Sequence, residues 1–331
     1  MKAITQDRYG PPDVLRLTEV DRPAARGAEV LVRVHAAAVN AADWHYMRGD
    51  PYLARGMMGL GAPRTKIRGV DFAGRVAAVG PDVTRLRPGD EVYGEARGTF
   101  ADYVCAEEGV VDTMPANLTF AQAAAVPMAG NTALLGLRDV QPGQRVLING
   151  ASGGVGTFAV QIAKAFGAEV TAVCSHRNVE LVGSLGADRI VDYLREDFAR
   201  TAPGQDLVFD LVGNRSLADL RRALRPKGRL VLSGGGVSTG GSVVGPMGLI
   251  MKARLLAPFL RHRVQVLSAR QGTENLATLR DLIESGKVKP VIDRSYPLAE
   301  TVEAIRYLED EHARAKVVIV VADSHSDDAN I

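Results

Sequence analysis

The order of apolar and polar positions divides the chain into two parts. Up to about residue 120, short runs that alternate or are rich in small apolar residues are separated by turn residues such as the Pro-Gly pair at 88–89. Examples are EVLVRVHAAAVN (29–40), GVDFAGRVAAVG (69–80) and GTFADYVCAEE (98–108). This pattern predicts a compact, β-rich region without repeats.

From about residue 120 the pattern changes to strands that alternate with helices. An alanine-rich stretch with helical spacing, interrupted at Pro127, comes first. We then expect strands over 145–149, 169–174, 189–192, 206–211, 228–232 and near 264–269, with helices over 154–167, 178–186 and 215–224. Such alternation predicts a parallel, doubly wound sheet and therefore an α/β fold. A strand, a helix and another strand follow, and the residues after Val321 are polar.

The segment MGLIMKARLLAPFLRHRVQ (247–265) is apolar with basic residues. A basic amphipathic helix can lie on a membrane surface. A short segment that contains Pro258 is a poor anchor, however. We interpret it as a helix that packs on the sheet, or covers a pocket or subunit contact, with Lys252 and Arg254 in solvent.

Composition limits the protein class. The 331 residues have room for one large domain or two medium ones, and 46% hydrophobic with 24% charged residues is ordinary for a globular protein. A formal net charge of +2 gives no reason to expect a nucleic-acid partner, and no apolar stretch reaches the roughly 20 residues of a membrane span. The N-terminus lacks the apolar core of a signal peptide, and two cysteines cannot make a disulfide framework. We expect a cytoplasmic protein.

A glycine-rich loop follows the strand at 145–149. Residues 151–156, ASGGVG, match the G-x-G-x-x-G pattern with alanine in the first position. Here Gly153 would let the backbone approach a pyrophosphate at the start of the helix, and Gly156 would let that helix pack closely on the sheet. The loop therefore predicts a dinucleotide site.

The end of the next strand indicates which dinucleotide binds. NAD-specific sites place an acid there to accept hydrogen bonds from the ribose. The stretch Cys174-Ser175-His176-Arg177-Asn178 contains none. Ser175 can donate to a 2′-phosphate and Arg177 can pair with it. We therefore predict NADPH.

These motifs carry a family resemblance. GQRVLINGASGGVGTFAVQIAK (143–164) resembles the quinone oxidoreductase and zeta-crystallin branch of the medium-chain dehydrogenase/reductases. VNAAD, IRGVDFAGRVAAVG, RPGDEVYG, GTFADYV, VPMAGNTALLGL, FDLVGN, GRLVLSGGG and HARAKVVIVV resemble further family blocks, in family order. Two positions depart from the pattern: Ala315 replaces a usual glycine, and Asn178 lies near the place of a common lysine. The segment 236–263 is closer to a subgroup that resembles reticulon-interacting oxidoreductases.

The resemblance implies a domain organisation and a set of site residues. We expect a GroES-like catalytic domain from residues 1–120 and 287–331, and a Rossmann domain from 121–286, with dimers formed through the Rossmann sheet. The cofactor would contact Asn40, Thr132, Ser152, Gly153, Gly154, Val155, Ser175, Arg177, Tyr193, Val212, Ser233, Gly234, Gly235 and Lys316. Of these, Thr132 would approach the nicotinamide or pyrophosphate, Tyr193 the adenine and Lys316 the phosphate end.

Zinc-dependent alcohol dehydrogenases of the superfamily need a cysteine where this chain has Asn40, and a His-Glu pair where it has Val70-Asp71. Valine cannot ligate a metal, so we expect no metal. Without a Lewis acid, hydride transfer suits an acceptor that spreads the incoming charge over its own conjugated system.

The chemistry then points to quinones or α,β-unsaturated carbonyls as small-molecule substrates. Asn40 could touch the nicotinamide or the substrate oxygen, and Tyr46 and Tyr52 are candidate proton donors, although solvent can supply the proton. We interpret Asp43 as buried and structural. Two alternatives stay open: an enoyl-thioester or biosynthetic tailoring reductase, and a non-catalytic NADPH-binding scaffold.

Overall fold

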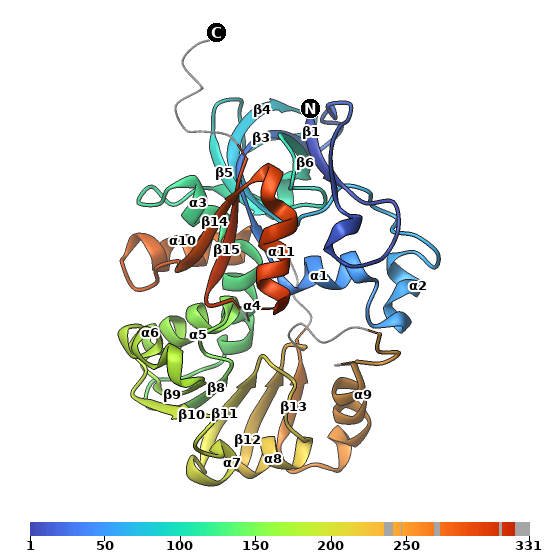
Figure 1. Ribbon diagram of the computed structural model, residues 1–331. Helices are drawn as coiled ribbons and strands as arrows, with labels where there is room; N and C mark the ends of the chain where they lie inside the picture. The colour runs from blue at the N-terminus through green and yellow to red at the C-terminus, as the bar shows by residue number, and fades with distance from the viewer. Residues whose placement is uncertain (235–240, 246, 268–271, 311–312, 322–331) are drawn as a thin grey trace.

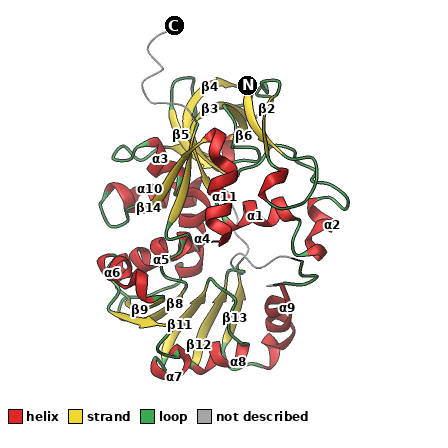
Figure 2. Ribbon diagram, in the orientation of Figure 1, coloured by secondary structure: helices red, strands yellow, loops and turns green. Residues whose placement is uncertain are grey.

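The fold is known from a computed structural model, which describes residues 1–234, 241–245, 247–267, 272–310 and 313–321. Two large sheets lie at opposite ends of the molecule, and helices α4 (Pro127–Leu137) and α5 (Gly154–Ala165) lie between them (Figures 1 and 2). The expected α/β class is therefore confirmed.

One large sheet has six parallel strands in the order β10-β9-β8-β11-β12-β13. Its strands are β8 (Arg145–Asn149), β9 (Glu169–Cys174), β10 (Arg189–Asp192), β11 (Gln205–Asp210), β12 (Leu224–Leu232) and β13 (Arg263–Val266). Because consecutive strands run in the same direction, their carboxyl ends meet at one edge, where doubly wound sheets bind ligands. This sheet is the expected Rossmann sheet.

The other large sheet has seven strands in the order β14-β15-β3-β4-β5-β7, with β6 paired to β3. It joins distant parts of the chain: β3 (Glu29–Val39), β4 (Asp71–Val79), β5 (Glu91–Glu95), β6 (Tyr103–Glu107), β7 (Val111–Thr113), β14 (Ile292–Pro297) and β15 (Lys316–Val320). Strand β15 pairs with β14 in parallel and with β3 antiparallel. Both halves of the chain thus build the expected GroES-like unit, while the exact domain boundaries at 120 and 287 stay a prediction.

The remaining elements are shorter or cover the sheets. Strands β1 (Lys2–Thr5) and β2 (Arg16–Glu19) form a two-stranded sheet. The other α-helices are α1 (Ala41–Arg48), α2 (Arg55–Met58), α3 (Phe120–Ala124), α6 (Val179–Ser184), α7 (Phe198–Thr201), α8 (Leu217–Arg222), α9 (Met247–Leu256), α10 (Thr273–Glu284) and α11 (Thr301–Asp310). Single 3-10 turns are η1 (Pro12–Val14), η2 (Tyr52–Ala54), η3 (Glu108–Val110), η4 (His176–Asn178), η5 (Ala257–Phe259) and η6 (Leu298–Glu300).

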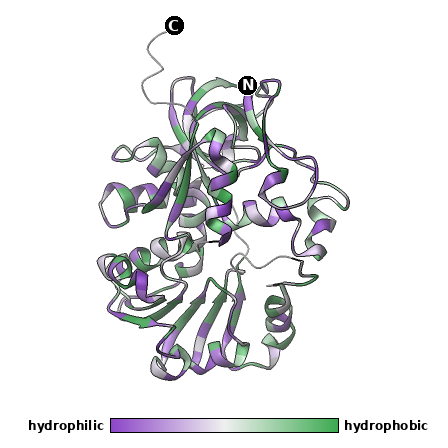
Figure 3. Ribbon diagram, viewed as in Figure 1, coloured by the Kyte–Doolittle hydropathy of each residue, from purple (hydrophilic) through white to green (hydrophobic). Residues whose placement is uncertain are grey.

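Buried apolar residues hold the two sheets together. The largest cluster contains residues of β3 and β4, helices α3, α4, α5 and α10, and one face of the six-stranded sheet. A second cluster fills the seven-stranded unit, and a third covers the opposite face of the six-stranded sheet. In Figure 3 the strands of the six-stranded sheet carry largely the hydrophobic colour, as expected for a parallel sheet covered on both faces.

Helix α9 lies in the basic, apolar segment 247–265, for which a membrane-surface helix and a helix packed on the sheet were considered. Its Leu249, Ala253 and Leu256 pack against the apolar cluster of the six-stranded sheet. Lys252 and Arg254 are exposed. The interpretation of a helix that packs on the sheet with solvated basic residues is therefore confirmed.

Candidate functional site

The glycine-rich loop lies at the carboxyl end of β8 and begins α5. Gly150 has a φ of +90° and makes the tight turn, so the turn glycine is one residue before the alanine expected there. A Cβ at Gly156 would lie 2.1 Å from the Gly150 carbonyl oxygen. The predicted close packing at Gly156 is thereby confirmed. A Cβ at Gly153, the N-cap of α5, would have the same oxygen at 3.5 Å as its nearest neighbour, so the loop surface at Gly153 is open.

A buried carboxylate organises the neighbouring strand end. Asp210, the last residue of β11, accepts hydrogen bonds at Oδ1 from Asn149 Nδ2 at 2.8 Å and from the backbone N–H groups of Val212 and Gly213 at 3.3 Å. Burial raises the pKa of Asp210, and these hydrogen bonds oppose that rise. Ser233 donates its backbone N–H to the Asp210 carbonyl. Val212 and Ser233 are thus both fixed at the carboxyl edge of the sheet.

A second buried polar cluster lies where β3 ends. Lys316 Nζ donates to Asn40 Oδ1 at 2.5 Å and to the Val39 carbonyl at 3.2 Å, and it lies 3.4 Å from Asp71 Oδ2. Asn40 Nδ2 donates to the same Asp71 oxygen at 3.0 Å. Lys316 and Asp71 are 2% and 0% exposed. We call Asn40, Asp71 and Lys316 the buried triad.

The start of β15 connects this triad to the glycine loop. Ala315 donates its backbone N–H to the Ser152 carbonyl at 2.8 Å. A Cβ at Gly154 would lie 3.0 Å from Lys316 Cδ. Lys316 therefore passes directly beside the first turn of α5, with its ammonium turned to Asn40 and Asp71.

Asp43 lies in the first turn of α1, next to the triad. It is buried, as predicted, and its Oδ2 accepts the backbone N–H of Asn40 at 2.8 Å. No partner bonds its buried Oδ1 among the described residues. Burial raises the pKa of Asp43 to about 7, a rise that the Asn40 N–H opposes and the charge of Asp71 supports. This carboxyl group therefore titrates near neutral pH.

Helix α4 brings Thr132 to the same region. Thr132 Oγ1 donates to the Met128 carbonyl at 2.7 Å, and the Met128 N–H donates to Asp71 Oδ1 at 3.1 Å. Burial raises the pKa of Asp71, and Lys316, Asn40 and this N–H oppose that rise. Both oxygens of Asp71 thus have partners.

The residues predicted to select the cofactor lie at the end of β9. Asn178 is buried and donates from Nδ2 to Ser152 Oγ at 2.9 Å and to Ser175 Oγ at 3.3 Å. Since both hydroxyl oxygens accept from Asn178, each keeps its own proton to donate to a ligand. Arg177 is exposed in η4, and the Tyr193 N–H donates to the Cys174 carbonyl at 3.1 Å, which holds Tyr193 at this end of the sheet.

The sequence alone did not reveal an acid beside these residues. Asp192 ends β10 in register with Cys174. Its Oδ2 lies 3.7 Å from His176 Nδ1 and 3.5 Å from Arg195 Nε. The segment 174–178 contains no acid, but the neighbouring strand β10 brings the Asp192 carboxylate close to His176 at the start of η4.

The two candidate proton donors lie farther out. Tyr46 on α1 and Tyr52 in η2 are 40% and 46% exposed. Within the described ranges, no hydrogen bond joins either phenol to the buried triad. Arg55 lies over the Tyr52 ring at 4.5 Å. The Tyr52 N–H donates to the Ser242 carbonyl, which connects this turn to the segment before α9.

The structure therefore gathers most of the expected cofactor residues at one place and leaves the tyrosines at its margin. The residues at the carboxyl edge of the six-stranded sheet or beside it are Asn40, Thr132, Ser152, Gly153, Gly154, Val155, Ser175, Arg177, Tyr193, Val212, Ser233, Gly234 and Lys316. Gly235 lies outside the described residues. The organising roles of Asp210, Asn178 and Asp192 were not predicted from the sequence. A charged residue at the end of a buried strand, as in FD at 209–210, was the available signal.

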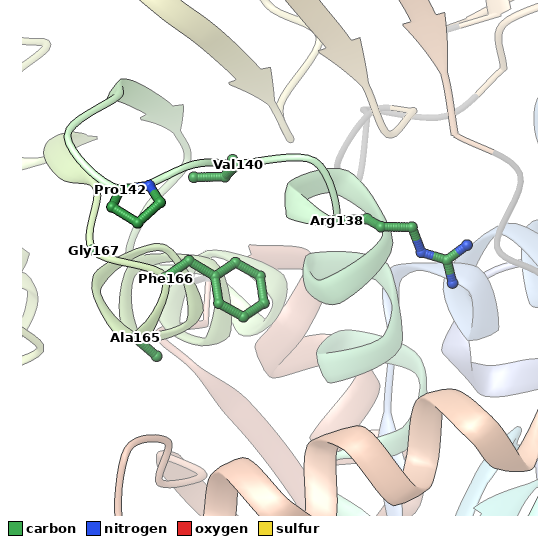
Figure 4. Close-up of a pocket in the computed structure, with 6 residues that line it drawn as sticks. All are labelled: Arg138, Val140, Pro142, Ala165, Phe166 and Gly167. Carbon is green, nitrogen blue, oxygen red and sulfur yellow. The ribbon is translucent and has the colours of Figure 1, made fainter.

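Two further observations limit where ligands bind. Among the residues that the structure describes, no three His, Cys, Asp or Glu side chains gather as a metal-binding group. A hollow of about 490 Å³ is lined by Arg138, Val140, Pro142, Ala165, Phe166 and Gly167 (Figure 4). It lies before the start of β8 and after the end of α5 and does not include the glycine loop. We therefore place the candidate site at the opposite, carboxyl end of the sheet.

None of the described helices is long and apolar enough to cross a bilayer.

Comparisons with known proteins give consistent matches over nearly the whole chain. Residues 26–168 match the alcohol dehydrogenase GroES-like domain, and residues 185–319 match the zinc-binding dehydrogenase domain. The chain is 36% identical to 2-methylene-furan-3-one reductase of Solanum lycopersicum and 34% identical to a chloroplastic NADPH-dependent alkenal/one oxidoreductase of Arabidopsis thaliana. Each match covers 96% of this chain and 79% of the relative. The solved quinone oxidoreductase of Coxiella burnetii has a TM-score of 0.85 and 33% identity, over 97% of this chain and 99% of that one.

Proposed function

Because the chain belongs to the medium-chain dehydrogenase/reductase superfamily, in its zinc-independent quinone oxidoreductase branch, we propose that it reduces quinones or α,β-unsaturated carbonyls with hydride from NADPH. It is an oxidoreductase with a nicotinamide cofactor and a small-molecule substrate. One observation carries the proposal: the open glycine loop and the buried triad lie side by side, connected through Lys316.

The residues of the loop fit a dinucleotide. Gly153 caps α5 without a side chain, so the N–H groups of the first turn are not satisfied by a side-chain cap. A negative pyrophosphate is stabilised at such a helix start by these donors and by the helix dipole. The Ser152 hydroxyl is oriented by Asn178 with its proton available. Gly154 and Val155 would complete the pyrophosphate contacts.

We assign preference for NADPH over NADH to Ser175 and Arg177. The Ser175 hydroxyl keeps a proton to donate, and the Arg177 guanidinium is exposed at the end of β9. Both are suited to a 2′-phosphate. Asp192 would repel such a phosphate, but its carboxylate lies 3.5 Å from the Nε of Arg195, whose positive charge offsets it. Tyr193 would pack near the adenine.

The bound nicotinamide supplies the hydride, and the protein's residues hold the reactants and the proton. In Asn40, the carbonyl oxygen accepts from Lys316, and the amide nitrogen donates to Asp71 and Ala38. We assign a contact with the carboxamide of the nicotinamide to this oriented Asn40 side chain. Thr132, Val212, Ser233 and Gly234 would line the same half of the cofactor.

We propose that no metal takes part, since Val70 and Asn40 stand at the positions of two ligands of the zinc-dependent relatives. A conjugated acceptor does not need a Lewis acid, because it spreads the incoming charge itself. The proton that completes the reduction would come from Tyr46, Tyr52 or solvent. A homodimer through the Rossmann sheet and a cytoplasmic location stay predictions; one matched relative is named chloroplastic.

The test is oxidation of NADPH and NADH by the purified protein with quinones, enones, enoyl-CoA esters and simple ketones. We expect turnover of quinones or enones with NADPH and none with simple ketones. A clear preference for enoyl-CoA esters would favour a tailoring reductase. NADPH binding without turnover of any acceptor would favour a scaffold and contradict the proposal.

A further inference from the structure

Two long segments of the chain contain no acidic residue. Between Asp50 and Asp71 the chain has four Lys or Arg residues and no Asp or Glu, and between Asp219 and Glu274 it has ten Lys or Arg residues and no Asp or Glu. Since the whole chain has a net charge of only +2, the rest of it is net acidic. The positive charge of the protein is therefore concentrated in these two segments.

The same two segments carry most of the strongly exposed apolar side chains. In the first, Leu53, Met57 and Leu60 are 55%, 76% and 81% exposed. In the second, Met251 and Leu255 of α9 are 53% and 75% exposed. Single exposed apolar residues are ordinary, but a group of long, flexible ones indicates an interaction site.

Hydrogen bonds connect the chain near α2 to the chain just before α9. The Leu53 N–H donates to the Val243 carbonyl at 3.2 Å, and the Ser242 N–H donates to Asp50 Oδ2 at 3.0 Å. Val243, itself 63% exposed, lies four residues before α9. In Figure 1, α2 and α9 lie on the same side of the molecule. We call Leu53, Met57, Leu60, Val243, Met251 and Leu255 the α2–α9 surface.

Four of the basic side chains in these two segments have no acidic partner among the described residues. Arg64, Lys252, Arg254 and Arg261 are exposed, and none of them forms an ion pair with a carboxylate of the described residues. Other arginines of the same acid-free segment do pair, such as Arg225 with Asp206. The charge around the α2–α9 surface is therefore available to an anionic partner.

We propose that the α2–α9 surface docks on an anionic lipid bilayer, with its apolar side chains inserted between headgroups and its basic residues on lipid phosphates. Peripheral binding of this kind requires no spanning segment. A second copy of the chain suits the surface less well, because a two-fold contact brings two surfaces of the same positive charge together. The docking rests on this surface alone and does not depend on the proposed reaction.

The test is cosedimentation of the full chain with vesicles of phosphatidylcholine alone or with about one third phosphatidylglycerol. We expect binding to the anionic vesicles only. The double variant M251S/L255S and the double variant K252Q/R254Q should each bind at least about tenfold more weakly. The matched control is L194S, which removes an equally exposed leucine, 71% accessible, in the turn after β10. Unfolding midpoints of all variants verify that each one folds.

Three results would overturn the proposal. Wild-type protein could fail to bind anionic vesicles, or L194S could lose binding as much as M251S/L255S does. Alternatively, sedimentation could show that M251S/L255S converts a dimer into a monomer, and the surface would then be a subunit contact.

Discussion

The ammonium group of Lys316, at the start of β15, donates a hydrogen bond to the side-chain oxygen of Asn40 at the end of β3, with a length of 2.5 Å. The same group lies 3.4 Å from Asp71 Oδ2. One buried cation therefore orients the candidate catalytic amide and neutralises the carboxylate that anchors α4.

Replacing Lys316 by methionine should lower both stability and activity. The variant keeps the apolar stem but leaves Asp71 buried without its cation, which costs about 3–5 kcal/mol of unfolding free energy. It also releases Asn40, so we expect kcat to fall. Denaturant unfolding and steady-state kinetics measure the two effects. The control is K66M, which removes an exposed ion pair with Asp7 and should cost less than about 1 kcal/mol. Equal stability of the two variants would contradict the role of Lys316.

Asp43 should make the folded protein less stable as the pH rises from about 4 to 7. Its pKa is raised from 3.8 to about 7 in the folded state, so the folded protein binds more protons than the unfolded chain in this window. The contribution of Asp43 to stability is then complete below pH 4 and falls by up to about 1.4 kcal/mol per pH unit. Substitution D43N removes this contribution.

The measurement is the free energy of unfolding of wild type and D43N at several pH values between 4 and 8. The difference between the two curves isolates Asp43 from the other carboxyl groups. We expect D43N to gain stability relative to wild type as the pH rises. A constant difference across the window would show that Asp43 titrates normally.

Alanine at Gly156 should lower stability, whereas alanine at Gly153 should lower the affinity for the cofactor. A Cβ at Gly156 would overlap the Gly150 carbonyl, so G156A should lose at least about 2 kcal/mol of stability. At Gly153 the contacts of an added Cβ are ordinary, so G153A should fold with nearly wild-type stability but bind NADPH more weakly. Thermal unfolding and cofactor titration distinguish the two variants. The control G56A adds a Cβ where nothing lies within 4 Å. Normal cofactor affinity in G153A would place the pyrophosphate elsewhere.

Removing the Arg177 side chain should change the choice of cofactor. A charge-assisted bond contributes about 1.5–3 kcal/mol, so R177A should bind NADPH about ten- to a hundredfold more weakly, with NADH affinity unchanged. Fluorescence titration with both cofactors measures this difference. The control is R200A, an exposed arginine of α7 that pairs with Asp197. If R177A and R200A behave alike, Arg177 does not contact the 2′-phosphate.

The local sequence pattern was sufficient to predict the architecture and part of the candidate site. Strands 169–174 and 189–192 have the expected bounds, because buried parallel strands are apolar runs bounded by turn residues. The short helices α1, α2 and α7 were not expected, since their stability depends on tertiary contacts such as the burial of Trp44 and Met47.

The polar clusters could not be predicted because their members are far apart in the sequence. Lys316 and Asn40 are 276 positions apart. The family resemblance implied that Lys316 reaches the phosphate end of the cofactor. In the structure its ammonium group is instead turned to Asn40 and Asp71. Asp192 was missed for a similar reason: strand pairing, which no local pattern specifies, brings it beside His176.

The position of Lys316 in β15 has a consequence for synthesis on the ribosome. The glycine loop and the six-stranded sheet precede β15 in the chain, but the cation of the triad and the Ala315 N–H that bonds the Ser152 carbonyl both belong to the start of β15. A nascent chain therefore lacks both contacts until β15 has left the ribosome.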